Sequence, residues 1–129
     1  MAQPGGPAGA GGGLDMKSAE ERIVEAVTPI VAVCEPDFYI PESGEEVEEE
    51  YCTYAVSAEP MAFGDNAPRC VRAIVTLHWY LPLGVRPNAK RLALCRALRA
   101  AGFTYPVVQN ATDSVGQHWV FECEGLEEA

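Results

Sequence analysis

The first periodic pattern along the chain is helical. Ser18 and Glu21 have the spacing of a capping box, and Asp15 could also cap a helix by accepting from free backbone N–H groups. Apolar residues then recur every three or four positions, while charged residues mostly occupy the other side. Pro29 removes a backbone donor, so we expect this helix to end or kink within residues 26–30.

A second helical pattern lies between Pro87 and Gly102. Proline suits the first turn of a helix and glycine suits a left-handed residue after its end. Leu94 and Leu98 belong to an apolar stripe between these two signals. The sequence therefore predicts a helix that buries one side.

The region between the helices has the alternation of a β-hairpin. Apolar or aromatic residues alternate over residues 51–56 and again, more clearly, over residues 71–81. Residues 63–68 have turn chemistry, and Pro60 limits the first strand to an edge strand or a broken one. We expect the two segments to pair as a long antiparallel hairpin.

A shorter hairpin is expected at the end of the chain. Residues 105–108 and 117–123 have the composition of strands, and residues 110–116 between them are rich in turn formers. The order helix, hairpin, helix, hairpin predicts an α+β two-layer sandwich, with an antiparallel sheet of about four strands and two helices packed on one face. The expected core comprises Ile23, Val27, Val75, Leu77, Trp79, Leu94, Leu98, Trp119 and Phe121.

Composition limits the chain to one domain. Its 129 residues, 48% of them hydrophobic, suffice for one core, which we place in residues 14–129. Residues 1–13 hold six glycines and no basic residue, so we expect a disordered Gly/Pro-rich arm and no secretory signal. The longest apolar run, residues 26–34, is too short to span a bilayer, so we expect no membrane contact.

Charge is unevenly distributed along the chain. The net charge of -10 disfavours a protein that binds nucleic acid through phosphates, so we expect no sequence-specific nucleic-acid binding. Residues 86–99 nevertheless hold five of the nine basic residues. Two charged sets are candidates for lateral contact between identical subunits: Arg86, Lys90, Arg91, Arg96 and Arg99 on the basic side, and Glu45, Glu46, Glu48, Glu49 and Glu50 on the acidic side. Each set could also be a solvated surface, and the acidic run could bind a cation, although it lacks the ligand pattern of a calcium loop.

Candidate chemistry is sparse. His78 and His118 each precede a tryptophan on a predicted strand. A catalytic or metal-binding role would need His118 to meet His78, Cys70 or Asp113 across the sheet; otherwise both are surface histidines beside aromatic neighbours. The sequence contains no nucleophile motif, phosphate-binding glycine loop or HExxH motif, so we assign no catalytic residue, metal or cofactor.

The cysteines do not indicate a site. They stand at positions 34, 52, 70, 95 and 123, an odd number without a CxxC pair. We expect reduced thiols that are mostly buried, as in a cytosolic protein.

Three segments of the chain resemble a known group of proteins. The segments Leu98-Arg-Ala-Ala-Gly-Phe-Thr-Tyr-Pro106 and Ala111-Thr-Asp-Ser-Val-Gly-Gln-His-Trp-Val-Phe-Glu-Cys-Glu124, with Phe63-Gly-Asp-Asn-Ala-Pro68 before a strand, are similar to tail terminator and tail completion proteins of long-tailed bacteriophages and prophages. The resemblance covers about residues 15–124. The glycine-rich arm and the length of the acidic loop, residues 42–50, depart from the pattern of that family.

The resemblance implies a virion structural protein that is not an enzyme. Such proteins form a homo-oligomeric ring, commonly a hexamer, at the head-proximal end of the tail tube. The ring stops tail polymerisation and serves head–tail joining during virion assembly in the host cytoplasm, with the tail tube protein and head connector proteins as partners.

Three alternatives remain open from the sequence. One is a head–tail connector or other minor tail protein, and a more distant one is an acidic inhibitor that mimics DNA. The third is a small metal-dependent enzyme built on His118, Asp113 and Cys123.

Overall fold

The computed structural model describes residues 17–37, 47–64 and 67–128; the arm expected at 1–13 lies outside this range. The described chain is α+β, with two helices and a five-stranded mixed sheet. The elements in chain order are α1 (Ala19–Val27), β1 (Cys34–Pro36), β2 (Tyr51–Gly64), β3 (Ala67–Leu81), α2 (Asn88–Ala100), β4 (Val107–Asn110) and β5 (Gln117–Glu128).

The sheet contains one strand that the sequence did not predict. Its strand order is β1-β2-β3-β5-β4, and every neighbouring pair is antiparallel except β1 and β2, which are parallel. Five strands are roughly compatible with the expected four or so, whereas the expectation of an antiparallel sheet is corrected to a mixed one, because β1 is parallel to β2. β1 is three residues long and ends in Pro36, so it has too few positions to show an alternating pattern.

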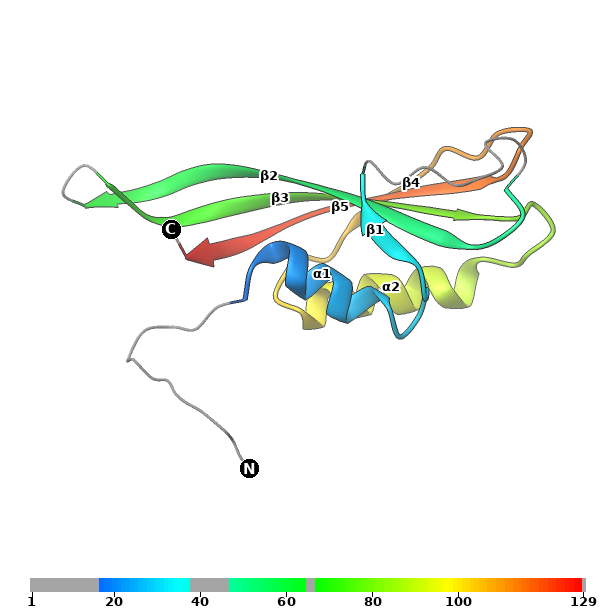
Figure 1. Cartoon of the computed structure of the whole chain (residues 1–129), viewed down its shortest axis with the longest axis horizontal. Coiled ribbons are helices and arrows are strands. Elements are labelled where there is room, and N and C mark those ends of the chain that lie inside the picture. The colour runs from blue at the N-terminus through cyan, green and yellow to red at the C-terminus, as the bar shows by residue number, and fades with distance from the viewer. Residues whose placement is uncertain (1–16, 38–46, 65–66, 129) are drawn as a thin grey trace, which may run out of the picture.

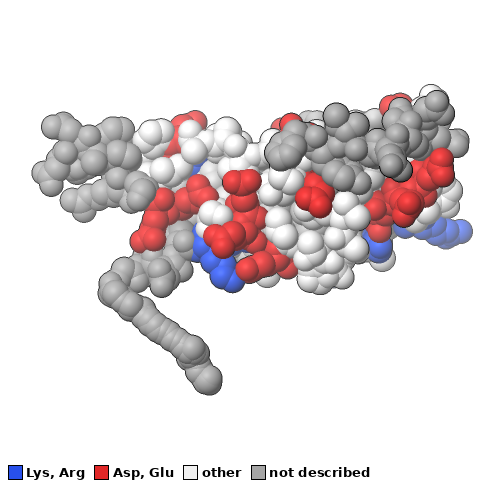
Figure 2. All heavy atoms as spheres, in the orientation of Figure 1, with Lys and Arg blue, Asp and Glu red and all other residues white. Residues whose placement is uncertain are grey.

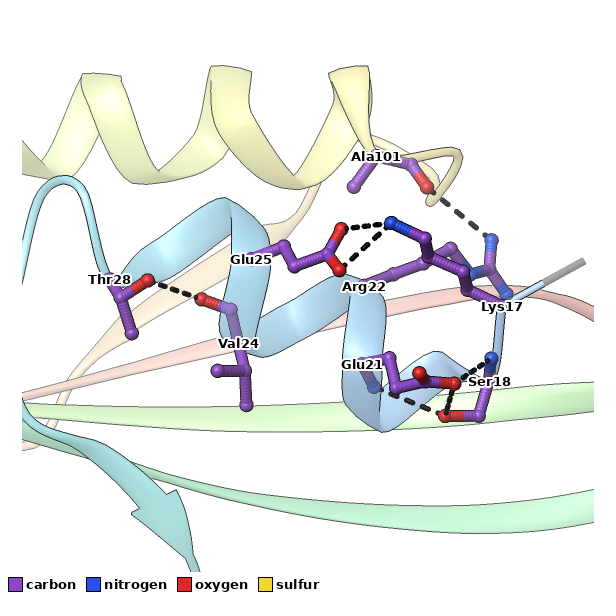
Figure 3. A network of polar contacts seen from close by, with 8 residues as sticks. All are labelled: Lys17, Ser18, Glu21, Arg22, Val24, Glu25, Thr28 and Ala101. Atoms are coloured by element: carbon purple, nitrogen blue, oxygen red, sulfur yellow. Dashed lines mark hydrogen bonds and ion pairs between the residues drawn. The ribbon is translucent and has the colours of Figure 1, made fainter. Parts of the chain in front are cut away.

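The start of α1 follows the predicted capping box. The Ser18 hydroxyl accepts from the Glu21 backbone N–H, and the Glu21 carboxylate accepts from the Ser18 backbone N–H (Figure 3). Because helix ends leave backbone donors without partners, this reciprocal pair stabilises the first turn. The helix ends at Val27, two residues before Pro29, within the predicted range.

The end of α2 follows the predicted glycine cap. Gly102 has a φ of 101°, the left-handed conformation that glycine adopts without strain. The Gly102 N–H donates to the Arg99 carbonyl and the Phe103 N–H to the Leu98 carbonyl, at 3.1 and 3.2 Å. These two bonds form a Schellman motif, which redirects the chain toward β4.

The hairpin of β2 and β3 is longer than predicted. Residues from Tyr51 to Gly64 pair with residues from Tyr80 to Ala67, and the far end of the hairpin extends beyond the two helices (Figure 1). β1 pairs only with Cys52–Tyr54, so Pro60 lies where β2 is an edge of the sheet. An edge position tolerates the donor that proline lacks, which agrees with the prediction.

The core lies between the helices and one face of the sheet. Figure 1 shows α1 and α2 on the same side of the sheet. Of the nine expected core residues, Trp119 is half-buried and packs against the core, and the other eight are fully buried. The alternation of β3 is clear, since Val75, Leu77 and Trp79 are buried while Ile74 is exposed.

Candidate functional site

The outward side of α2 carries the clearest charged surface. Arg96 and Arg99 are exposed, and they stand three positions apart, so they are neighbours on the helix surface. Arg86 is exposed in the loop before the helix, whereas Arg91 is half-buried. Within residues 17–37, 47–64 and 67–128, none of these four arginines has a carboxylate within 4 Å.

The fifth basic residue of this set is already paired inside the subunit. The Lys90 ammonium lies 2.7 Å from one carboxylate oxygen of Glu50. The other oxygen of Glu50 accepts from the indole N–H of the fully buried Trp79, at 2.8 Å. Glu50 thus joins the acidic segment, which we define as residues 45–50, to both the sheet core and α2.

The acidic segment is described from Val47 onward, and Glu45 and Glu46 lie outside the described residues. The Val47 N–H donates to the Val115 carbonyl at 2.8 Å, and the Val47 side chain fills the space that a side chain at position 116 would need. Glu48 and Glu49 are exposed between this anchor and Glu50. The short segment that carries them is therefore held against the protein by contacts at both ends.

Most of the charged side chains on the surface are acidic (Figure 2). Figure 2 shows acidic side chains over much of one face of the molecule, while basic side chains lie mainly along its lower border. A large hollow of about 480 Å³ is lined in part by Arg22, Arg72 and Glu124. Both guanidinium groups already have protein partners. Arg72 pairs with Glu59 and Glu124. Arg22 donates to the carbonyl of Ala101 (Figure 3) and to that of Leu126.

One residue that shapes the basic surface was missed by sequence reasoning. The buried Gln117 amide donates to the carbonyls of Pro82, Leu83 and Val85, at 2.9, 3.3 and 2.6 Å. These bonds hold the loop that carries Arg86 into α2. A buried glutamine among apolar strand residues was the available signal, because buried amides need hydrogen-bond partners.

The two histidines meet on the face of the sheet opposite the helices. The Nδ1 atom of His78 on β3 lies 2.8 Å from the Nε2 atom of His118 on β5. Tyr80 stacks on His118 with ring centroids 4.4 Å apart, and Tyr51 stacks on Tyr80 at 4.7 Å. Both expectations for the histidines are thus present together: His118 meets His78, and both lie beside aromatic rings.

The environment of His118 favours its neutral form. Burial lowers the pKa of His118, electrostatic interaction with the neighbouring imidazole of His78 lowers it further, and the carboxylate of Asp113 acts in the opposite direction. A neutral imidazole can accept a hydrogen bond or bind a metal ion.

The three residues of the enzyme alternative are not assembled. Cys123 is buried on the side of β5 that faces the helices, whereas His118, an odd number of positions away, points to the other face. Among the residues with described positions, no group of three or more histidine, cysteine, aspartate or glutamate side chains surrounds a common metal position.

The cysteines are free thiols, as expected. Cys70 is half-buried and the other four are buried. Burial raises the pKa of the Cys34 and Cys123 thiols to about 12, because the thiolate is poorly solvated there. These thiols are unreactive at neutral pH.

The chain matches no model of a known protein family, and no curated protein matches it. In the described part of the chain, neither helix is long and apolar enough to cross a membrane.

Proposed function

We propose that this protein is a non-enzymatic structural protein of a long-tailed phage virion, located at the head-proximal end of the tail. In this proposal, identical subunits form a ring at the end of the tail tube, where they stop tail polymerisation and join the tail to the head connector. The basic surface of α2 on one subunit contacts the acidic segment of the next.

The observation that carries the proposal is the arginine pair Arg96 and Arg99. Like charges at this spacing repel each other by a few tenths of a kcal/mol, about the amount that an opposite pair would contribute. Within the described part of the subunit, no carboxylate lies close enough to offset this repulsion. An acidic surface on another molecule would do so.

The chain itself contains such an acidic surface. Glu48 and Glu49 are exposed and are anchored at both ends of their short segment. A contact between two different surfaces of identical subunits is heterologous, and it closes into a ring when the rotation between subunits allows. The pair of Glu50 and Lys90 is satisfied within one subunit, so we assign it to positioning the segment rather than to direct contact.

The proposal also includes a two-layer sandwich, with α1 and α2 as one layer over the sheet. Support comes from the burial of one face of β3 and from the helix residues Ile23, Val27, Leu94 and Leu98, which join the same core. The helix side and the open side of the sheet would then give each subunit distinct surfaces for the tube and the head connector.

The test is the oligomeric mass by light scattering over a range of protein concentrations and ionic strengths. We expect a discrete ring at low salt that dissociates as salt rises, because exposed charges are screened. A monomer under every condition would contradict a ring held by these charged surfaces.

Charge-reversal variants locate the contact. Arg99→Glu should weaken assembly by at least about tenfold, since it replaces an attraction with a repulsion. Lys17→Glu is the matched control: it makes the same charge change at an exposed residue whose partner is Glu25. Equal weakening of assembly by the two substitutions would show that the net charge of the subunit, and not a contact at Arg99, controls assembly.

A swapped variant provides the decisive check. Combining Arg96→Glu and Arg99→Glu with Glu48→Arg and Glu49→Arg restores both the opposite charges and the wild-type net charge. Assembly should return in the swapped variant and be absent in the arginine double variant.

Two other outcomes would favour the alternative functions. A head–tail connector would be favoured if the isolated protein stayed monomeric but bound a head-completion ring. An inhibitor that mimics DNA would be favoured if the protein bound a DNA-binding enzyme.

A further inference from the structure

The pair formed by His78 and His118 has a geometry that suits a metal ion. The two residues lie on β3 and β5, neighbours in the middle of the sheet whose register is fixed by pairing from Cys70 to Leu81. Tyr80 lies opposite His118, and Val120 lies opposite His78, so the imidazoles meet on the diagonal between these pairs. Cross-strand diagonal neighbours are within reach of long or aromatic side chains.

The orientation of the His118 ring is fixed before any ligand binds. Its plane is 16° from that of Tyr80, whose other face stacks on Tyr51 at 17°. This stack spans three adjacent strands. A ring held in place loses little conformational entropy on binding, which favours a ligand that needs both imidazoles at once.

The distance between the two nitrogens selects the kind of ligand. Two imidazole nitrogens bound about 2.0–2.1 Å from one ion are about 2.9 Å apart at a right angle and about 3.4 Å apart in a tetrahedron. His78 Nδ1 and His118 Nε2 are 2.8 Å apart. The separation of the two nitrogens is thus within about a tenth of an ångström of the right-angled arrangement, which square-planar or octahedral ions prefer, and the rings must also turn so that both lone pairs point at the ion.

We propose that His78 and His118 form a two-imidazole chelate for a late first-row divalent metal ion of the Ni²⁺ or Cu²⁺ class. The ion binds Nδ1 of His78 and Nε2 of His118, and water completes its coordination. In the metal-free pair, one of these nitrogens carries the shared proton. On binding, that proton moves to the other nitrogen of the same ring, so both lone pairs face the ion and the two neutral rings release no proton.

The local charge favours a cation at this position. Asp113, in the turn before β5, interacts electrostatically with His118, and the whole chain has a net charge of -10. Both histidines are half-buried, so one side of the pair remains open to water. This inference concerns the sheet face opposite the helices and does not depend on the proposed ring.

The chain offers a direct test because it contains two histidines in all. Untagged full-length protein with reduced thiols is titrated with NiCl₂ while the two imidazole Cε1–H signals are followed by NMR. Paramagnetic Ni²⁺ should broaden both signals together and saturate at one ion per subunit. Broadening of neither signal, or of one alone, would overturn the proposal.

Calorimetric titration with NiCl₂ of substituted proteins gives the second measurement. His78→Ala and His118→Ala should each weaken Ni²⁺ binding at least about tenfold and to the same level as the double variant, because a chelate needs both rings. Thr76→Ala, a half-buried position on the same face of β3, is the matched control and should leave binding unchanged. Retained affinity in either histidine variant would show that carboxylates bind the ion and would refute the chelate.

Discussion

Removal of the Glu50 carboxylate should destabilise the fold far more than removal of its neighbours. Glu50 is the acceptor for the indole N–H of Trp79, a side chain with 0% exposure, and it also pairs with Lys90. In Glu50→Ala, the indole N–H is left buried without this partner. An unsatisfied buried donor costs about 1–3 kcal/mol.

The lysine adds little to this effect. The Lys90 side chain is 47% exposed, and exposed ion pairs contribute at most about 1 kcal/mol. We therefore expect Glu50→Ala to lower the free energy of unfolding by about 2–3 kcal/mol and Lys90→Ala by less than about 1 kcal/mol. Glu50→Gln should lie between them, because an amide oxygen can still accept from the indole.

Urea unfolding followed by tryptophan fluorescence measures these losses. Both tryptophans pack in or against the core, so their emission reports its exposure to water. Glu49→Ala is the matched control, since it removes the same charge from an exposed neighbour. For a domain of this size, each kcal/mol corresponds to about 3–5 °C in the melting temperature.

Two results would refute this reasoning. A loss below about 0.5 kcal/mol in Glu50→Ala would show that the indole N–H finds another partner. Equal losses in Glu50→Ala and Glu49→Ala would show that removal of negative charge, and not the hydrogen bond to Trp79, sets the stability.

Two further predictions concern the helix cap and the buried thiols. Gly102→Ala should lower the free energy of unfolding by at least about 1 kcal/mol, because φ is 101° there and the added Cβ would lie 3.0 Å from Arg22. Gly84→Ala is the control, since no atom lies within 4 Å of its added Cβ, and it should change stability little in the same urea assay. Burial raises the pKa of Cys34 and Cys123 from 9.0 to about 12, so above pH 9 the unfolded chain loses these protons first. The free energy of unfolding should therefore be intact below pH 9 and fall as pH rises toward 12, and the fall should be less steep in Cys123→Ala. The measurement is the urea midpoint of each protein at pH 8 and at pH 10, in the presence of reductant. An equal fall in Cys123→Ala would remove this thiol as the cause.

Local signals were the most informative part of the sequence. The capping box at Ser18 and the glycine cap at Gly102 both lie where the sequence placed them, because each depends on residues within a few positions of one another. The alternation over residues 71–81 likewise predicted the buried face of β3. The same reasoning extended poorly to the ends of strands: β2 continues to Gly64 because β3 pairs with it along its whole length, despite Pro60.

The candidate sites were only partly visible in the sequence. Charge segregation identified the arginines of α2, but it did not reveal that Lys90 and Glu50, 40 positions apart, pair inside the subunit. A glutamine among apolar strand residues indicated that Gln117 needs hydrogen-bond partners, but not that these partners are the carbonyls of the loop before α2. Both features depend on contacts between segments that approach each other only after the sheet forms.

By itself, the sequence determined the position of both helices and of the two hairpins, and the apolar side of the helices and of β3, because periodicity and helix caps depend on residues that are close together in the chain. Only the tertiary structure decided which strands are neighbours. It added the parallel strand β1, placed Glu50 against Trp79, and brought His78 within 2.8 Å of His118. Such distances are set by strand register and by the route of the chain between strands, and a shift of one residue would turn either histidine to the opposite face.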